Sequence, residues 1–459
     1  MKRLLLSAVT LLTITGCNDA KNQNKESMDN LMTKDKTVEW AHSTNIYEVN
    51  LRQYSTEGTF AAFARDLPRL KDMGVRTLWF MPITPISQKN KKGTLGSYYA
   101  ASDYTSINPE FGTMDDFKNL IKQAKAMDFK VIIDWVANHT GWDHRWTVEH
   151  PEYYERDSIT GDFLAASGMD DIIELDFANP GLRKAMIDAM IFWVKECDID
   201  GFRCDLAAWV EVDFWQEARP IIDSVKHLFW LGEFDELEKP EYGKVFDVSY
   251  SWRWMHTTRE FYQNQLPLVV LDSLLMQYSQ LGDSSMRAWF TTNHDENSWN
   301  GTEYEKYGGM AKALAVFSAT WDGVPLIYNG QEIPLLDKRI LFFDKDPIPW
   351  TGNNQLHDFY KTLLNLHSSN PALRGGDPTA RTIGIHTSDS INVLVFLRKK
   401  EDREVLVILN MSRHDGITVQ LNDDHLSGTF RNVFTGQNET ISKGTTKNLK
   451  AWEYLVFEK

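Results

Sequence analysis

The sequence predicts an α/β fold: a (β/α)8 TIM barrel with an inserted subdomain after strand 3 and a C-terminal antiparallel β domain. Three observations predict it. Apolar runs of strand length alternate with helical patterns down to about residue 369, which is typical of a parallel sheet covered by helices. Eight such runs occur, and eight strands close a barrel. After about residue 371 the pattern changes to short alternating segments separated by turn-rich loops.

The barrel elements follow one another in a regular order. The first strand is expected at residues 45–53, where apolar and polar residues alternate. A helix is expected at 59–73, because apolar residues recur at helical spacing and Gly74 follows as a C-terminal signal. A further helix is expected at 115–127. The remaining barrel strands are expected in near-continuous apolar runs at 75–81, 131–136, 200–203, 228–233, 245–248, 288–293 and 324–329.

One connection is irregular, and it follows the third strand. Residues 137–178 show no strong period and are rich in aromatic, acidic and glycine residues, after which a helical pattern resumes at Pro180. A loop of this length in a compact domain is usually functional, so we expect a small subdomain at one side of the barrel mouth. We place the barrel at 41–375 and a C-terminal β-sandwich domain at 376–459. Its strands are expected at 392–398, 404–411, 416–421, 428–433 and 452–458.

The composition excludes one class of partner. The 459-residue chain is 42% hydrophobic and 25% charged, which is ordinary for a soluble globular protein. Its net charge is −15, and phosphate binding needs a basic surface, so nucleic acid is not expected as a partner. The 16 Trp, 16 Tyr and 24 Phe suit stacking against sugar rings, although aromatic residues more often form the core.

The N-terminus resembles a bacterial export signal. Lys2 and Arg3 precede an apolar run that is too short to span a bilayer as a mature helix. The run ends in Ile-Thr-Gly-Cys at 14–17, which resembles the lipobox, in which cleavage precedes a cysteine that then carries lipid. We therefore expect a lipoprotein signal peptide at 1–16 and a flexible tether at 17–40. The protein would be exported and lipid-anchored through Cys17 to a bacterial membrane, the outer one. The alternative is a plain secretory signal with an incidental cysteine.

The stretch from Asp200 to Asp205 brings an arginine and a carboxylate together at the end of a predicted strand. Residues i and i+2 of a strand share a face, so Arg203 is expected to lie beside Asp205 and hold it ionised. Taken alone, this pair is better explained as a structural ion pair, because such pairs perturb pKa values without catalysing anything.

Other predicted strands end in polar residues as well. The carboxyl ends of barrel strands open on one face, where active sites lie. Five groups would therefore converge in one pocket, and a chance meeting of five is implausible. They are Asp205, Glu233, Asp295, His139 and His294.

Two carboxylates in different surroundings are what glycosidic cleavage requires. Asp205 has Arg203 beside it, which we expect to lower its pKa and keep it ionised as a nucleophile. Glu233 follows an apolar strand, so we expect a raised pKa and a role as general acid. Asp295 would stabilise a developing positive charge.

Each neighbouring polar residue has a functional and a structural interpretation. His139 and His294 offer ring N–H donors to sugar hydroxyls, with structural histidines as the alternative. Asp134 is better explained as a structural carboxylate beneath the site.

Four stretches resemble the motif regions of glycoside hydrolase family 13, the α-amylase family. They are DWVANH (134–139), GFRCD (201–205), GEF (232–234) and NHDEN (293–297), and two flanking segments, 96–104 and 323–332, also match. The resemblance implies a retaining double displacement with Asp205 as nucleophile, Glu233 as acid/base and Asp295 as transition-state stabiliser. It also implies substrate-binding roles for Tyr99, which would stack under the sugar being cleaved, and for Arg203, His139 and His294.

The sequence departs from this family just after Asp205. Many α-amylases carry a Lys-His pair there that helps to bind calcium and sugar, whereas this chain has Ala208 and Trp209. Asn138 does match a family calcium ligand, and Asp170 and Asp171 offer oxygen ligands suited to a hard cation. A Ca²⁺ ion at Asn138 is therefore expected, and no organic cofactor. The alternatives are a solvated acidic loop, and an Asn138 that only bonds to the insertion.

The substrate is expected to be an α-glucan or malto-oligosaccharide. Segments 139–144 and 151–154 resemble bacterial α-amylases more than α-1,6-glucosidases, and the N-terminal β domain of neopullulanases and cyclomaltodextrinases is not seen. This favours internal hydrolysis of α-1,4 links. One alternative is a malto-oligosaccharide-specific α-glucosidase, a cyclomaltodextrinase-type enzyme or a transglycosylating member. Another is a non-catalytic, glucan-binding surface lipoprotein, which the three carboxylates disfavour.

Overall fold

A computed structural model describes residues 36–282, 285–334, 338–350, 352 and 354–459. The predicted signal peptide, Cys17 and most of the predicted tether lie outside these residues. Packing begins at Val38, which is buried and precedes a 3-10 helix, η1 (Glu39–Ser43). In the described part of the chain, no helix combines the length and the apolar character needed to cross a membrane.

The predicted barrel is confirmed. Eight parallel strands close on themselves in the order β1-β10-β9-β8-β7-β6-β3-β2. Their residues are almost all buried, as expected for a parallel sheet that is filled inside and covered by helices outside. The strands are β1 (Ile46–Val49), β2 (Thr77–Phe80), β3 (Lys130–Val136), β6 (Gly201–Asp205), β7 (Phe229–Asp235), β8 (Val248–Tyr250), β9 (Met286–Trp289) and β10 (Val324–Tyr328).

Two predicted elements differ from the sequence expectation: one strand ends early and one helix is divided in two. The predicted strand 45–53 ends at Val49, and a helical turn, α2 (Leu51–Tyr54), follows, because the buried side chain of Asn329 accepts the Asn50 N–H. The predicted helix 59–73 is two helices, α3 (Phe60–Ala64) and α4 (Leu67–Met73). Pro68 lies in the first turn of α4, where its missing N–H costs nothing but prevents α3 from running on.

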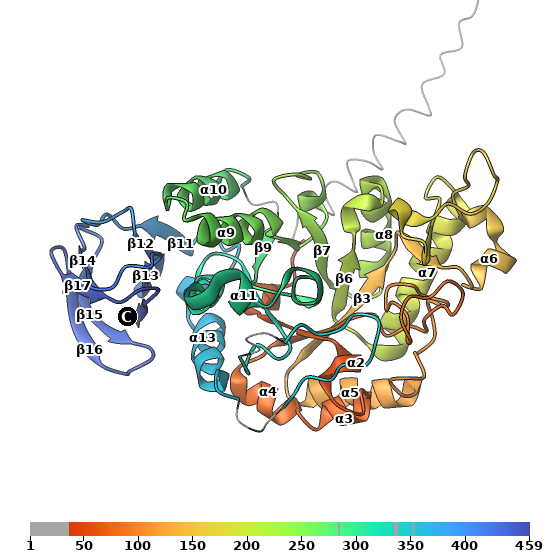
Figure 1. Ribbon diagram of the computed structural model, residues 1–459, viewed down its shortest axis with the longest axis horizontal. Coiled ribbons are helices and arrows are strands. Elements are labelled where there is room, and N and C mark those ends of the chain that lie inside the picture. The colour runs from red at the N-terminus through yellow and green to blue at the C-terminus, as the bar shows by residue number, and fades with distance from the viewer. Residues whose placement is uncertain (1–35, 283–284, 335–337, 351, 353) are drawn as a thin grey trace, which may run out of the picture. The chain divides into compact units, whose positions relative to one another are not determined.

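The other helices cover the barrel or extend its loops (Figure 1). Thr113 is the N-cap of helix α5, and its side chain accepts the Asp116 N–H while Asp116 accepts the Thr113 N–H. This reciprocal capping box fixes the helix start. The remaining α-helices are α7 (Pro180–Cys197), α8 (Val212–Asp223), α9 (Trp252–Asn264), α10 (Val269–Ser279), α11 (Glu303–Tyr307), α12 (Ala311–Thr320) and α13 (His357–Ser369), and α5 spans Met114–Ala126.

The inserted subdomain after the third barrel strand is also confirmed. Strand β4 (His139–Gly141) pairs antiparallel with β5 (Ile172–Glu174), and α6 (Trp146–Glu149) and two 3-10 turns, η2 (Pro151–Tyr153) and η3 (Ala166–Gly168), lie between them. The sequence did not predict β4 and β5, because three residues are too few to show a period. Since β4 starts two residues after β3 ends, the insertion begins at the barrel rim.

The C-terminal domain consists of two antiparallel sheets. Six strands pair in the order β11-β12-β13-β18-β15-β16, and β14 pairs with β17. Both sheets contribute to one apolar core, which includes Leu406 and Phe430 from the larger sheet and Val419 and Leu449 from the smaller. The strands are β11 (Arg381–Gly384), β12 (Val393–Lys400), β13 (Arg403–Asn410), β14 (Ile417–Gln420), β15 (Ser427–Asn432), β16 (Asn438–Ser442), β17 (Thr446–Leu449) and β18 (Tyr454–Glu458).

The larger C-terminal sheet shares a second apolar core with the barrel helices. Phe396 of β12 packs edge-on against Trp321, with ring centroids 4.8 Å apart, and both belong to a cluster that contains Phe317 of α12. The fully buried Arg398 donates to the carbonyl oxygens of Ala372 and Arg374, each at 3.0 Å. The sheet is therefore joined to the barrel by buried contacts.

Candidate active site

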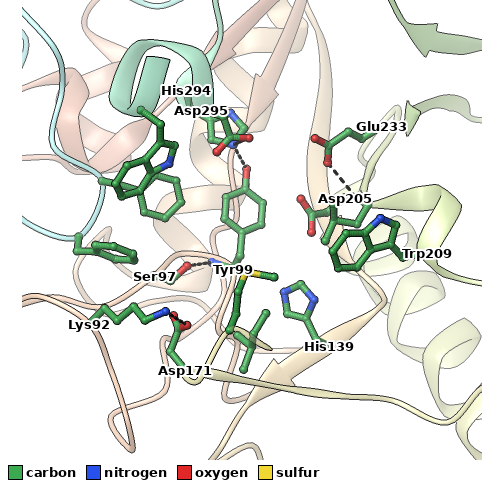
Figure 2. A pocket seen from close by; sticks show the side chains of 16 residues that line it. Lys92, Ser97, Tyr99, His139, Asp171, Asp205, Trp209, Glu233, His294 and Asp295 are labelled. Atoms are coloured by element: carbon green, nitrogen blue, oxygen red, sulfur yellow. Dashed lines mark hydrogen bonds and ion pairs between the residues drawn. The ribbon is translucent and has the colours of Figure 1, made fainter. Parts of the chain in front are cut away.

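A cavity of about 430 Å³ opens at the carboxyl ends of the barrel strands. Its lining includes six of the residues that the sequence analysis singled out (Figure 2). The volume lies in the usual range of small-molecule sites, which is about 300–1,000 Å³. The six residues are Tyr99, His139, Asp205, Glu233, His294 and Asp295.

The end of strand β6 places Asp205 and Glu233 side by side. Asp205 is the last residue of β6, and Leu206 after it adopts a left-handed conformation with φ 42°. This conformation is uncommon for a residue with a branched side chain and turns the chain sharply. The Leu206 N–H consequently donates to Oε2 of Glu233 at 2.9 Å.

Arg203 is shared by three carboxylates. Its Nη1 lies 2.8 Å from Oδ1 of Asp205 and 3.0 Å from Oδ1 of Asp134, and its Nη2 lies 2.7 Å from Oε2 of Glu233. The sequence analysis had paired it with Asp205 alone. Arg203 is fully buried and does not line the cavity, so it acts on the site through these carboxylates. Asp134 lies beneath the pocket and also accepts from Trp79.

Burial dominates the titration of Asp205 and Glu233. It raises the pKa of Asp205 to about 6, against the opposing charge of Arg203. Burial likewise raises the pKa of Glu233 to about 7, and Arg203 again opposes the shift. The expectation that the pKa of Asp205 would be lowered is therefore wrong, because one guanidinium divided among three carboxylates does not offset desolvation. Glu233 still keeps its proton to a higher pH than Asp205.

His294 is held between two carboxylates and a phenol. Its Nδ1 lies 2.5 Å from Oε1 of Glu48, and its Nε2 lies 2.7 Å from the Tyr99 hydroxyl and 3.3 Å from Oδ2 of Asp295. Although burial opposes it, the charges of Asp295 and Glu48 raise the pKa of His294 to about 9. At neutral pH the ring is an imidazolium, and both of its nitrogens donate.

The second histidine of the pocket, His139, is uncharged, unlike His294. Burial lowers the pKa of His139 to about 4, so its ring is neutral at pH 7. Its Nδ1 lies 3.3 Å from the Asn138 amide nitrogen. The pocket therefore contains one charged and one neutral imidazole, a difference that depends on tertiary neighbours and is invisible in the sequence.

Tyr99 forms the floor of the cavity. Its ring stacks on His294 with centroids 5.4 Å apart and on Phe342 with centroids 6.2 Å apart. Its hydroxyl donates to Oδ2 of Asp134 at 3.1 Å, and its backbone N–H donates to the Ser97 hydroxyl. These contacts fix the ring plane that a sugar would meet.

Several residues of the site were missed by sequence reasoning. Glu48 lies in the first barrel strand and is fully buried. The sequence signal that could have found it is a carboxylate between Tyr47 and Val49 in a predicted strand. The others lie outside the quoted motifs, although Trp299 is in η6 (Glu296–Asn300), two residues after the NHDEN segment. They are Lys92, Trp299, Phe342 and Phe343, which line the cavity.

Two of the carboxylates proposed as calcium ligands beside Asn138 have another partner. The two insertion carboxylates that the sequence offered as ligands are both paired with Lys92, whose Nζ lies 2.9 Å from Asp170 and 2.8 Å from Asp171. Over the described ranges, no group of three or more His, Cys, Asp or Glu side chains is placed to hold a metal ion. Calcium at Asn138 thus stays a prediction, and no chemical step is assigned to it.

The comparisons with known proteins agree on one family. A family model described as the α-amylase catalytic domain matches residues 29–166 and 152–383. Alpha-amylase 2 of Dictyoglomus thermophilum is 25% identical over 427 residues, which cover 86% of this chain and 70% of that protein. Maltogenic alpha-amylase of Bacillus acidopullulyticus is 25% identical over 426 residues, covering 85% and 68%.

A solved structure agrees with this assignment. The noncanonic maltogenic alpha-amylase of Thermotoga neapolitana superposes with a TM-score of 0.82 at 29% identity, covering 91% of this chain and 99% of that one. The family model spans most of the barrel, and the cavity at the barrel mouth contains the carboxylates of the family motifs. The chain belongs to the α-amylase family of glycoside hydrolases.

Proposed function

We propose that the protein hydrolyses α-1,4-glucosidic bonds of starch-like glucans or malto-oligosaccharides with retention at the anomeric carbon. One observation carries this proposal: Asp205 and Glu233 contact the two terminal nitrogens of one buried guanidinium and face the same cavity. Retaining glycosidases use two carboxyl groups about 5–5.5 Å apart, one as nucleophile and one as acid/base.

The first step forms a covalent intermediate. A carboxylate oxygen of Asp205 attacks the anomeric carbon, and the bond from that carbon to the glycosidic oxygen breaks. Glu233 gives its proton to that oxygen, so the leaving chain departs as a neutral alcohol. The raised pKa of Glu233, about 7 through burial, keeps this proton available near neutral pH.

The second step releases the sugar. Glu233, now ionised, takes a proton from a water molecule, whose oxygen attacks the anomeric carbon and displaces Asp205. Two inversions give net retention. Arg203, paired with Asp205 at 2.8 Å, favours the carboxylate form in which Asp205 leaves.

The remaining residues bind the sugar and its developing charge. Asp295, whose side chain is 38% exposed at the cavity, is suited to stabilise an oxocarbenium ion. The neutral ring of His139 supplies a donor to a hydroxyl group, and the imidazolium of His294, whose N–H groups are directed at Glu48 and Tyr99, holds the aromatic floor and Asp295 in place. Tyr99 provides an aromatic face under the reacting ring.

The test is hydrolysis of amylose by the wild type and by Asp205→Asn and Glu233→Gln, with product anomers followed by NMR. The wild type should release the α-anomer first. Each variant should lose on the order of 10³-fold or more in kcat, as expected when a catalytic group is removed. Cleavage that persists in Asp205→Asn would refute the mechanism. Binding of amylose by the wild type without release of sugar would support the non-catalytic alternative instead.

We also propose, from the N-terminal sequence, that the protein is exported and lipid-anchored through Cys17 to a bacterial outer membrane. Expression in a bacterial host with a labelled fatty acid tests this. Label should appear in the wild type and be lost in Cys17→Ser, whereas a plain secretory signal predicts no label in either.

A further inference from the structure

The two ends of the cavity differ in construction. Glu233 and Trp209 lie on one side of Tyr99, and Lys92 and Asp171 lie on the other (Figure 2). The second side is formed by four segments that are separate in the chain: the loop after β2, the insertion, η6 (Glu296–Asn300) and the segment after β10. We call it the Lys92 wall, made of Lys92, Asp171, Trp299, Phe342 and Phe343, all of which line the cavity.

The first part of the Lys92 wall is an ion pair between the loop after β2 and the insertion. Lys92 Nζ lies 2.8 Å from Oδ1 of Asp171, whose side chain is only 7% exposed, and 2.9 Å from Asp170. The backbone oxygen of Asp170 also accepts from the indole N–H of Trp142. The insertion is therefore tied across the cavity edge to the opposite loop.

The second part joins the same loop to the segment after β10. The Leu95 N–H donates to the Phe343 oxygen at 3.1 Å, and Thr94 donates to Oδ1 of Asp344 from its backbone N–H at 2.8 Å and from its hydroxyl at 2.6 Å. A Cβ atom on Gly93 would lie 2.5 Å from Cβ of Phe343. The contact between these two segments is closely packed, and position 93 at its centre accommodates only glycine.

The third part is aromatic. The rings of Phe342 and Phe343 lie 5.5 and 5.7 Å from Trp299, and Phe342 also stacks on Tyr99. The Gln53 side-chain amide donates to the Leu341 and Asp344 oxygens at 2.7 and 2.6 Å, which anchors the segment to the barrel rim. The Lys92 wall therefore continues from the insertion to Trp299.

The chemistry decides which part of the substrate meets each side. The general acid must lie next to the oxygen of the leaving group, so the leaving chain lies on the side of Glu233. The non-reducing part of the substrate then points toward the Lys92 wall. On the leaving side, Trp209 is 46% exposed and offers an aromatic face along the exit path.

We propose that the Lys92 wall closes the non-reducing side of the site, so that the enzyme binds the non-reducing ends of chains and releases short units from them. The leaving chain runs outward over Trp209. This inference rests on the proposed function, and it replaces the expectation of internal cleavage drawn from the sequence.

The experiment compares p-nitrophenyl maltoheptaoside with the same compound carrying a 4,6-O-ethylidene block on its non-reducing glucose. Products are separated by chromatography and identified by mass. The wild type should cleave the free substrate at least about 50-fold faster than the blocked one. Equal rates on both substrates would overturn the inference and leave the proposed function standing. No cleavage of either substrate would refute the proposed function itself.

Two variants test whether the Lys92 wall causes the selectivity. Lys92→Ala removes the ion pair and Phe343→Ala removes part of the aromatic surface, and each should lower the ratio of free to blocked rates at least about tenfold. The matched control is Lys118→Ala, because Lys118 has similar exposure and also pairs with a carboxylate, Glu196, at 2.9 Å between α5 and α7. It should keep the wild-type ratio. An unchanged ratio in both wall variants would overturn the inference.

The proposed path of the leaving chain over Trp209 is tested separately, by KM values. Trp209→Ala should raise KM for p-nitrophenyl maltoheptaoside by about tenfold, as loss of one aromatic contact predicts, and leave KM for maltotriose within about twofold. Equal changes in both KM values would contradict the path over Trp209.

Discussion

The hydroxyl group of Tyr99 offers a sharp test of how the pocket is held together. It accepts from the imidazolium of His294 at 2.7 Å and donates to Oδ2 of Asp134 at 3.1 Å. Tyr99→Phe removes this one atom and retains the ring that would stack under the sugar. We expect the stacking contribution to substrate binding to persist and the alignment of His294 to be lost.

The expected loss of kcat in Tyr99→Phe follows from the two hydrogen bonds that the Tyr99 hydroxyl makes with His294 and Asp134. A hydrogen bond to a charged group contributes about 1.5–3 kcal/mol. Both bonds here are to charged groups, and both are buried. If one such contribution is lost at the transition state, kcat should fall about 10- to 100-fold, since about 1.36 kcal/mol corresponds to a factor of ten. KM should change by less than about threefold, because the aromatic face remains.

The assay is steady-state hydrolysis of a p-nitrophenyl malto-oligosaccharide, with KM and kcat determined separately. Tyr98→Phe is the matched control, because Tyr98 is the adjacent residue, is buried, and packs edge-on against the same Phe342 ring with centroids 5.7 Å apart, without lining the cavity. It should keep the wild-type kcat.

A kcat of Tyr99→Phe within about threefold of the wild type would refute this reasoning. The same conclusion would follow from a loss that appears entirely in KM, because that result assigns the hydroxyl to substrate binding and not to alignment.

Four further predictions concern charge, metal and packing. The pH profile of kcat/KM should rise through about 6 and fall through about 7, because burial gives Asp205 and Glu233 pKa values near these figures; a flat profile from pH 5 to 9 would contradict it. Glu48→Gln should lower stability most below pH 6.5 and least above pH 9, since the raised pKa of His294 contributes stability that is lost as pH rises through about 9; denaturation midpoints across this range decide it. If calcium binds at Asn138, excess EDTA should lower the unfolding temperature in calorimetry; an unchanged temperature would remove the calcium assignment and leave Asp170 and Asp171 as partners of Lys92 alone. Gly201→Ala should destabilise the barrel by about 1–3 kcal/mol, because the new Cβ would lie 2.1 Å from the Phe229 oxygen; an unchanged denaturation midpoint would contradict this close approach.

The barrel was predictable from sequence because its strands are buried on both faces. Such strands appear as short apolar runs whatever their neighbours, and all eight were located to within a few residues of their observed bounds. The strands that were missed show no such pattern. For example, β16 is the segment Asn438–Ser442, in which a single residue, Ile441, is fully buried.

The cavity contains all five residues predicted from strand ends, because parallel strands deliver their carboxyl ends to one rim. Their charge states could not be predicted. The sequence places Arg203 two residues from Asp205, but nothing in it shows that Glu233 contacts the same guanidinium. Lys92 and Phe343 were missed for a related reason, because their roles depend on contacts between loops that are distant in the chain.

The shared core between the C-terminal sheet and the barrel limits how the enzyme can be divided. Phe396 and the fully buried Arg398 both face barrel-side groups, so a chain cut after the barrel would expose an apolar surface and leave carbonyl oxygens without their donor. The C-terminal sheets are therefore not a detachable module. To shorten this enzyme, or to replace its C-terminal sheets with those of a relative, helix α12 and the segment around Trp321 would have to be changed together with the sheets.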